Sequence, residues 1–446
     1  MNNQFEFFPT DTISKAAIDD KKSYSSKRRV NSPIRNQVVM RCSSLDDLIP
    51  EDHRARTIWD YVQQLDLSSI FRKIKVFEDG VGRSATDPYI LLALWLYATT
   101  EGIGSARVIE RYCSEHLAFQ WICGEVNVNY HTISDFRTNH KEELDELLTQ
   151  SVAILMKRGL IELNRVAQDG TRVRANAGTS SFHREKTLRE YMKIAEEQLK
   201  SLQKDIEEDP AKHMSQIEAR RKRAVVERKE NAEQAIKELE SYRKEIKMNK
   251  AGYSKKDVEK KVEGARVSKT DCEAKKMKMP NSGTNPAYNV QFATDTKSQI
   301  ILGVNVINVG YDYGQITPMM NQLADRYGKL PNEWLVDPGY RKMDDIEKAV
   351  ALNKNCKIYV PPATLKDGKI PSEEGVAAKE LRLRMNEEEA KVIYRERAST
   401  AECVNAIARN RGLQQFLVRG LQKVKCVALL FAITHNVMRG ISLINS

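Results

Sequence analysis

The segment Arg165–Asn176, with the sequence RVAQDGTRVRAN, organises the rest of the chain. Val166 and Val173 place β-branched residues on either side of its centre, which predicts a single strand. Asp169 and Gly170 interrupt this strand, although both residue types are depleted in strand interiors. Because Asp-Gly is a strong β-hairpin signal, one interpretation is a turn. The other is a carboxylate held on a rigid strand, beside a glycine that leaves room for a ligand or another backbone; the segment alone does not choose between them.

Two later segments each carry an acidic residue beside a predicted element. Residues 333–340, EWLVDPGY, form a short apolar strand that runs into Asp337 and is ended by Pro-Gly. Residues 394–412, YRERASTAECVNAIARNRG, are predicted to form a helix with Glu402 in its first turns. The chain therefore carries, in order, an Asp on a strand, an Asp at a strand end and a Glu on a helix.

This ordered set resembles the three carboxylates of a DDE transposase with a ribonuclease-H-like catalytic domain. Asp169 matches in DGT and Asp337 in VDPGY, and Glu402 matches in the helix that follows Tyr394 and Arg397. The stretches RNRGLQQFLVRGLQKVK and THN also resemble the C-terminal part of insertion-sequence transposases. No single motif is specific, but the ordered set is.

The resemblance implies a DNA transposase that cuts and joins insertion-sequence ends by two-metal-ion phosphodiester hydrolysis and transesterification. Carboxylate oxygens select hard cations such as Mg²⁺ or Mn²⁺ over zinc, and three neighbouring acids repel one another unless a cation lies among them. Two such ions can clamp the attacking and leaving oxygens of a phosphodiester. By resemblance, Asp169 would bridge both ions, Asp337 would hold one and Glu402 the other.

The resemblance also implies residues that contact DNA. Tyr394, Arg397 and Arg409 lie where the family has a Tyr-Arg-Glu-Lys signature, with Arg409 in place of the lysine. Arg409 follows Glu402 by seven residues, on the same helix face, and its guanidinium could hold a phosphate through two hydrogen bonds. The ring of Tyr394 could stack on a base. Together with Arg411, these are the predicted DNA contacts; the alternative is a core tyrosine and a surface charge.

The third carboxylate has other candidates. Residues 399–402, STAE, have the pattern of a capping box, in which Glu402 would only close a helix N-terminus. Glu396 is the nearest rival for the third acid, and Asp271 is a weaker accessory. Taken together with the two aspartates, the segment favours Glu402 as the catalytic acid.

The N-terminal part divides into a polar tail and a helical region. Residues 1–45 contain the basic run KKSYSSKRR and few apolar residues, which predicts a mobile tail that serves either solubility or contact with DNA phosphates. Residues 46–160 show helical patterning around the apolar run PYILLALWLY, with Asp87 as its cap and Thr132 or Ser134 capping a later helix. This region resembles the helical N-terminal domain of insertion-sequence transposases, which binds the element's ends; its arginines could also be an ordinary solvated face.

Residues 184–270 have a different composition, rich in Lys, Arg, Glu and Gln. Two heptad stripes predict two helices joined by a polar turn at Asp209–Pro210, which together form an antiparallel helical hairpin. The stripes consist of Leu188, Met192, Ala195, Leu199, Leu202 and Ile206, and of Val225, Ala232, Ala235, Leu239, Tyr242 and Ile246. The hairpin would be a spacer or dimer arm, or would contact DNA through residues 220–223.

Strand patterns return after this insertion. Strands are predicted at residues 286–294, 300–307 and 357–360, and helices at residues 314–327 and from 418 past 435. The sum is an α/β fold, in which residues 161–446 form a ribonuclease-H-like mixed sheet with flanking helices, interrupted by the hairpin.

Bulk composition limits the classes of function. The 72 basic against 61 acidic residues give a net charge of +11, which suits a polyanionic partner. We expect no membrane span, because no run of 18 apolar residues is present, and the seven cysteines contain no Cys-x-x-Cys pair for zinc or redox chemistry.

The expected partners are double-stranded DNA, as terminal inverted repeats and target, and further copies of the chain, in a homodimer or larger assembly on DNA. The expected location is cytoplasmic and nucleoid-associated. The alternative functions are a ribonuclease-H-like nuclease without strand transfer and a domesticated DNA-binding protein, although the three intact acids argue against the latter.

Overall fold

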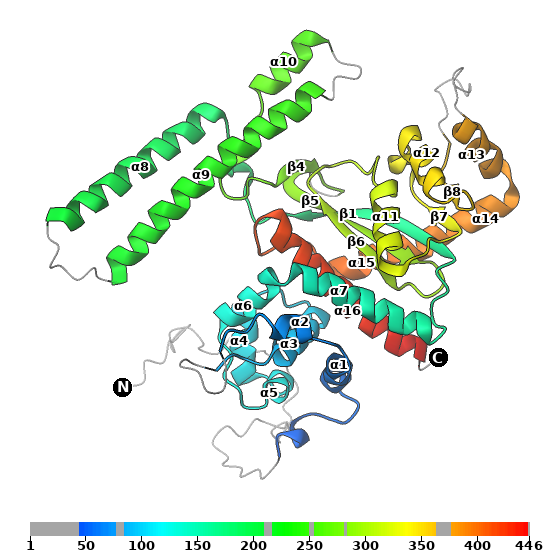
Figure 1. Ribbon diagram of the computed structural model, residues 1–446, viewed down its shortest axis with the longest axis horizontal. Helices are drawn as coiled ribbons and strands as arrows, with labels where there is room; N and C mark the ends of the chain where they lie inside the picture. Colours follow the sequence, from blue (N-terminus) through cyan, green and yellow to red (C-terminus); the bar gives the residue numbers. More distant parts are fainter. Residues whose placement is uncertain are drawn as a thin grey trace, which may run out of the picture. The chain divides into compact units, whose positions relative to one another are not determined.

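The computed structural model describes residues 44–76, 84–208, 216–248, 254–280, 283–362 and 376–444. All but the last two residues of the predicted basic tail, and the predicted turn at Asp209–Pro210, lie outside this set. The remainder, Leu45–Ser446, groups into a single unit in which helices occupy the N-terminal part and a mixed sheet follows (Figure 1). The prediction of an α/β chain with a helical N-terminal region is confirmed.

The N-terminal region packs around one apolar helix, α3. Asp87 caps this helix by accepting a hydrogen bond from the amide of Tyr89 at 2.8 Å, and its interior is buried on all sides. The prediction for the later helix was wrong: Asn129, rather than Thr132 or Ser134, caps α6. The elements of this region are a short 3-10 turn at Asp46–Leu48 and α1 (Arg54–Gln63), α2 (Ser68–Phe71), α3 (Pro88–Thr100), α4 (Ala106–Glu115), α5 (Leu117–Cys123), α6 (Tyr130–Asn139) and α7 (Lys141–Lys157).

A six-stranded mixed sheet follows, centred on β1. Strand β1 pairs antiparallel with β5 and parallel with β7, β5 pairs antiparallel with both β4 and β6, and β7 pairs parallel with β8. The strands are β1 (Arg165–Arg174), β4 (Lys275–Lys278), β5 (Thr284–Asp295), β6 (Ile301–Ile307), β7 (Glu333–Leu335) and β8 (Lys357–Tyr359).

Strand β1 runs unbroken through its Asp-Gly pair. Asp169 lies opposite Phe292, and Gly170 opposite Gln291, in the antiparallel ladder with β5. The hairpin-turn interpretation of this segment is therefore wrong, and the carboxylate is held on a central strand.

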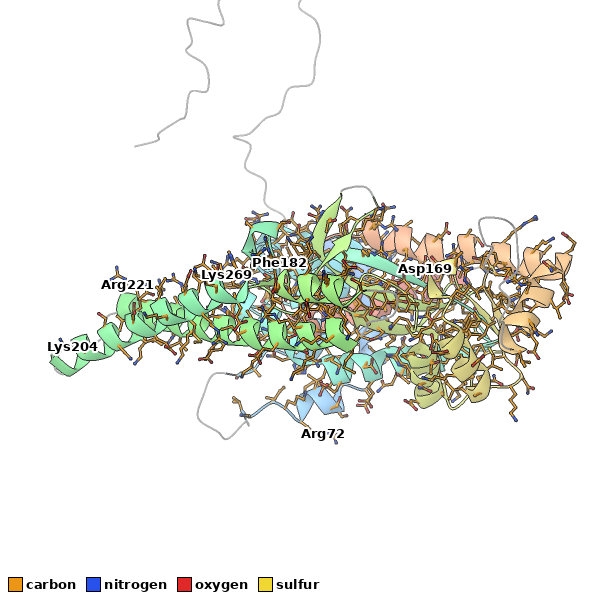
Figure 2. The ribbon with its side chains drawn as sticks, turned by 90° about the horizontal axis from the view of Figure 1, so that it is seen from above. Arg72, Asp169, Phe182, Lys204, Arg221 and Lys269 are labelled. Carbon is orange, nitrogen blue, oxygen red and sulfur yellow. The ribbon has the colours of Figure 1, made fainter. Side chains whose placement is uncertain are left out.

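The predicted helical hairpin lies between β1 and β5. Helices α8 (Glu185–Glu208) and α9 (Gln216–Met248) run side by side and are followed by α10 (Lys255–Glu263) (Figure 1). At its root, strands β2 (Phe182–His183) and β3 (Val267–Ser268) pair antiparallel. Figure 2 shows Lys204 and Arg221 together at the opposite end of the hairpin from Phe182 and Lys269. The buried stripe confirms the heptad prediction at Leu188, Ala195, Val225, Ala232, Ala235 and Leu239.

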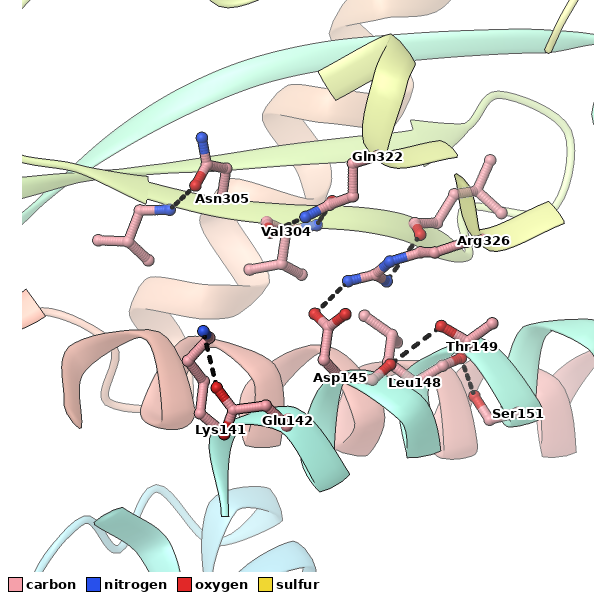
Figure 3. Close-up of polar contacts among 12 residues, drawn as sticks. Lys141, Glu142, Asp145, Leu148, Thr149, Ser151, Val304, Asn305, Gln322 and Arg326 are labelled. Carbon is pink, nitrogen blue, oxygen red and sulfur yellow. Dashed lines mark hydrogen bonds and ion pairs between the residues drawn. The ribbon is translucent and has the colours of Figure 1, made fainter. Parts of the chain in front are cut away.

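The remaining helices flank the sheet. They are α11 (Ile316–Tyr327), α12 (Met343–Leu352), α13 (Val376–Asn386), α14 (Glu388–Arg397), α15 (Cys403–Asn410) and α16 (Leu421–Ile444). Figure 3 shows how α7 and α11 are joined beside β6: Arg326 of α11 pairs with Asp145 of α7, while Gln322 bonds the backbone amide and carbonyl of Val304, each at 3.0 Å.

Helix α16 is the C-terminal core helix. By length and composition alone it could cross a membrane, but 61% of its most apolar window is buried inside the protein. Its Asn436 side chain bonds both the amide and the carbonyl of Ile301, each at 2.8 Å. The helix as a whole also contacts α3, α6 and α7. His435 is buried, its ring lies 2.9 Å from the carbonyl oxygen of Gln299, and burial lowers its pKa to about 4. The helix therefore serves as core.

Candidate active site

The side chain of Asp169 is the centre of a polar cluster on β1. It is 16% exposed. One carboxylate oxygen accepts a hydrogen bond from the amide of Gly170 at 2.9 Å, and the other accepts one from the side chain of Asn405 at 3.1 Å. A guanidinium nitrogen of Arg397 lies 3.6 Å from the second oxygen. These contacts come from β1, α14 and α15, so the carboxylate is held where a strand and two successive helical segments meet.

Gly170 is required at its position by side-chain crowding. A Cβ atom there would lie 2.3 Å from Gln291, 2.4 Å from Asp312 and 2.7 Å from Asn289. These three polar side chains fill the space over the glycine. The glycine therefore leaves room for side chains, rather than for a ligand or another backbone.

Asp312 is an acidic residue of this cluster that the sequence analysis did not identify. It follows β6 in a loop, and its carboxylate accepts hydrogen bonds from Asn289 at 2.7 Å and Gln291 at 2.6 Å. Both amides belong to β5 and are almost fully buried. Two polar residues at alternate positions of an otherwise apolar strand were the one available signal for this site.

The amide of Gln291 is itself held by a buried network. Its carbonyl oxygen accepts hydrogen bonds from Gln168 at 3.2 Å and from the hydroxyl of Tyr340. Gln168 in turn accepts one from the indole of Trp334 at 3.2 Å. Because buried polar groups are rarely left unpaired, this network restricts the rotamers that orient Asp312.

Asp337 follows β7, the parallel neighbour of β1, after one residue, Val336. Its carboxylate caps the 3-10 turn Pro338–Tyr340 by accepting a hydrogen bond from the amide of Gly339 at 2.8 Å. Burial, reinforced by the negative charge of Asp312, raises the pKa of Asp337. Two further acids thus lie near Asp169: Asp337 follows the carboxyl end of β7, and Asp312 lies in the loop after β6.

Glu402 does not close a helix N-terminus. Helix α14 continues through a π turn, Ala398–Glu402, into α15, and the hydroxyl of Ser399 donates instead to the carbonyl of Glu396 at 3.0 Å. The capping-box alternative is therefore wrong. The carboxylate of Glu402 pairs with Arg397 at 2.6 Å and is 53% exposed. Such π turns inside helices are frequent at functional sites.

The two rival acids are engaged elsewhere. Glu396 pairs with Arg165 at 2.5 Å, and Arg165 also pairs with Glu333 at 2.5 Å. Asp271 accepts hydrogen bonds from the hydroxyl of Tyr288 at 2.7 Å and from the amide of Gly420 at 3.2 Å. Neither rival contacts the Asp169 carboxylate.

The pKa of Asp169 reflects the burial of its carboxyl, the positive charge of Arg397 and the negative charges of the neighbouring acids. Burial, opposed by Arg397 and reinforced by Asp337 and Asp312, raises the pKa of Asp169 to about 6. Arg397 contacts both Asp169 and Glu402, so its guanidinium lies between them. Within the described residues no group of three acidic, His or Cys side chains is arranged to hold a metal ion.

The predicted DNA contacts separate into two places. The ring of Tyr394 lies 5.9 Å from the guanidinium of Arg397, beside the acids. Burial raises the pKa of Tyr394, and the charges of Asp337 and Asp169 act in the same direction. Arg409 is exposed, and its side chain makes no hydrogen bond or ion pair with the described residues. Arg411 lines a different cavity, beside Trp95 and Gly102.

The raised pKa of Asp169 gives a prediction about stability. A carboxyl whose pKa is about 6 in the folded protein and 3.8 ordinarily stabilises the fold below about pH 4 and loses that contribution as the pH rises through 6. Asp169→Asn cannot ionise. Its effect on the free energy of unfolding is therefore expected to be more favourable at pH 8 than at pH 4, by about 2–3 kcal/mol.

Denaturant titrations in EDTA at the two pH values measure this difference. Asp325→Asn, at an exposed position of α11, is the matched control. An equal effect of Asp169→Asn at both pH values would contradict the expectation.

Two known protein families match parts of the chain, one in the helical region and one in the C-terminal part. The transposase domain DUF772 matches residues 43–139, which include α1 to α6. A transposase DDE domain matches residues 352–441, which include Glu402 but neither Asp169 nor Asp337. No curated protein and no solved structure matches the chain. The two domains, in this order on one chain, are those of an enzyme that acts on DNA, and the chain therefore belongs to the DDE transposases of insertion-sequence type.

Proposed function

We propose that Asp169, Asp337 and Glu402 are the catalytic acids with which this transposase cuts and joins the ends of its insertion sequence. The observation that carries the proposal is the single guanidinium of Arg397, which contacts Asp169 at 3.6 Å and Glu402 at 2.6 Å. Asp169 and Glu402 come from β1 and from the π turn, and Asp337 raises the pKa of Asp169 from the end of β7. Three acids from distant segments therefore share one neighbourhood.

We further propose a ribonuclease-H-like fold for residues 161–446, interrupted by the hairpin at 184–270. The support is the strand arrangement: β6, β5 and β1 are successive antiparallel neighbours, and β7 and β8 add to β1 in parallel. In this proposal residues 46–160 are the domain that binds the terminal repeats, and residues 1–45 are a basic tail.

The acids suit divalent metal ions, which DDE transposases generally use. Their donors are all carboxylate oxygens, the kind that Mg²⁺ and Mn²⁺ prefer, and their mutual repulsion is balanced by one arginine. Asp169, Asp337 and Glu402 would hold the metal, as two Mg²⁺ or Mn²⁺ ions. Bound there, the metal would activate the attacking water or 3′-hydroxyl and stabilise the charge of the departing oxygen.

The chain's own residues prepare these acids. The amide of Gly170 and the side chain of Asn405 fix the two oxygens of Asp169, while the positive charge of Arg397 offsets part of the negative charge of Asp169 and Glu402. Because Arg397 lies between Asp169 and Glu402, metal binding requires its guanidinium to move away from at least one of them. A guanidinium remains charged at any relevant pH, so the released group would be free to pair with a DNA phosphate.

We also propose that the partner of this chain is double-stranded DNA. Tyr394, Arg397, Arg409 and Arg411 would contact double-stranded DNA at the terminal inverted repeats or the target. We propose a homodimer or larger assembly on DNA, in the cytoplasm at the nucleoid. A strand-transfer assay with pre-cut ends separates this function from that of a nuclease that only cuts.

Glu402 and Glu396 provide a matched test of the third acid. Both are glutamates on the same continuous helical segment, but Glu402 pairs with Arg397 and Glu396 pairs with Arg165. Glu402→Gln is expected to lower Mg²⁺-dependent cleavage at least about a hundredfold, because an amide is a poor ligand for a hard cation. Glu396→Gln is expected to stay within a few-fold of wild type.

The assay uses DNA carrying the terminal repeats that flank the coding region, with Mg²⁺ or Mn²⁺. Near-normal cleavage by Glu402→Gln would remove this residue from the site. Loss of cleavage in Glu396→Gln alone would assign the third acid to Glu396 instead.

A further inference from the structure

A solvent-open cavity lies apart from the acids, where the turn between α3 and α4 meets the segment that follows α15. The centres of water-sized spheres fit in about 60 Å³ of it, and the rest of the hollow is open to solvent. None of its described lining residues is acidic. Six of them matter for its chemistry: Trp95, Gly102, Gly104, Arg137, Arg411 and Gly412.

Arg137 of α6 forms the buried end of this cavity. It is only 6% exposed. Its guanidinium lies 4.4 Å from the ring of Trp95 and donates to the carbonyl of Gly104 at 2.6 Å, but its Nε atom is buried without a partner. Burial lowers its pKa to about 10. No carboxylate among the described residues pairs with it, which is unusual because buried charges are normally paired and hydrogen-bonded.

Arg411 is the second uncompensated cation. Its side chain makes no hydrogen bond or ion pair with the described residues, and its Nη1 atom is buried without a partner. Burial lowers the pKa of Arg411, and the nearby positive charge of Arg54 lowers it further. Two guanidiniums with unused donors therefore line one cavity that offers no negative charge.

The mouth of the cavity is built from glycine. Gly102 and Gly412 have φ angles of +72° and +86°, which favour glycine, and both are exposed. A Cβ atom on Gly412 would lie 2.9 Å from the carbonyl oxygen of Gly102. The glycines add no side chain at this rim, and Arg411 is half-buried beside it.

We propose that this cavity binds a phosphate group, and that the phosphate belongs to the backbone of the DNA substrate. A guanidinium fork matches phosphate oxygens in geometry and charge. The assignment to DNA rests on the proposed function, and on Arg411 directly following α15, the helix that begins beside Glu402. A phosphate held there would tie the helical region, through Arg137, to the segment that carries the third acid. The site would thus position DNA relative to the acids without touching the reacting atoms.

The first test measures inorganic phosphate binding by calorimetry at constant ionic strength. Arg411→Gln is expected to weaken phosphate binding by about tenfold or more, since it removes a charged hydrogen-bonding partner. Arg411→Lys keeps the charge without the fork and should be intermediate. Arg189→Gln, which removes one exposed arginine from the hairpin, should bind like wild type. Equal phosphate affinity in wild type and Arg411→Gln would overturn the site.

The second test identifies the source of the phosphate. With terminal-repeat DNA in EDTA, Arg411→Gln should bind more weakly and reduce the dependence of log K on log salt by about one, whereas Arg189→Gln should not. Lost phosphate binding with unchanged DNA affinity and salt slope would overturn DNA as the occupant in favour of a free anion. Failure of the proposed function is distinguishable, because it would leave both binding results intact and show only as uncut DNA.

Discussion

Replacement of Asp169 by Asn is expected to lower the rate of end cleavage at least about a thousandfold, with DNA binding retained. Asp169 is the centre of the site: it is bonded by Gly170 and Asn405, paired with Arg397 and electrostatically coupled to Asp337. An amide keeps the size of the side chain but removes one negative charge and one strong metal ligand. Metal-ion stabilisation contributes several kcal/mol to such reactions, which corresponds to a factor of this size.

Single-turnover cleavage of terminal-repeat DNA measures the effect, and a gel-shift assay with the same DNA measures binding. The control is Asp325→Asn, the same substitution on the exposed face of α11. Because Asp169→Asn is expected to be more favourable for stability at pH 8 than at pH 4, cleavage is measured at pH 8, and a denaturant titration at that pH shows whether the variant is folded. Cleavage within tenfold of wild type would exclude Asp169 as a metal ligand.

Gly170→Ala is expected to have the largest effect on stability, a loss of about 4 kcal/mol. The added methyl group would lie within 2.7 Å of three side chains, Gln291, Asp312 and Asn289. Overpacking of this kind costs about 1–3 kcal/mol, and broken hydrogen bonds to a charged group add about as much again. Cleavage should fall as well, since relieving the contact displaces Asp312 from its amide partners beside Asp169.

Gly178→Ala is the matched control for this substitution. A Cβ atom at Gly178 would meet only the hydroxyl of Ser180, at an ordinary 3.6 Å, and the backbone there is extended. Urea denaturation of the two variants gives the comparison. Equal stability of Gly170→Ala and Gly178→Ala would contradict the packing argument.

The place of Arg397 changes how the site is understood. From the sequence it is a predicted DNA contact; in the structure its guanidinium, only 15% exposed, is the counter-ion of Asp169 and Glu402. The two roles are compatible if metal and DNA bind together. The metal would then take the place of Arg397 beside the acids, and a DNA phosphate would become the new partner of Arg397. The π turn Ala398–Glu402 directly follows Arg397, and the side chains of Arg397 and Glu402 pair with each other at 2.6 Å.

Local patterns in the sequence predicted several of the elements and the order of the three acids. Apolar patterning within a few residues predicted β1, the helical hairpin and the apolar helix that became α3, and each of these formed as predicted. Local patterns were ambiguous where the same short sequence occurs in two different local structures. Asp-Gly can be a turn or a strand site, and Ser-x-x-Glu can be a capping box or part of a continuing helix.

Contacts between distant segments select one of the alternatives in each case. Gly170 lies in a strand because β5, from the far side of the hairpin, pairs with it, and Asn405 reaches Asp169 across 236 residues of sequence. Asp312 joins the site through amides on β5, and Arg137 meets Arg411 in one cavity. Propensity and periodicity act between near neighbours in the chain, whereas these contacts arise from sheet pairing and helix packing between distant segments. No local pattern encodes them.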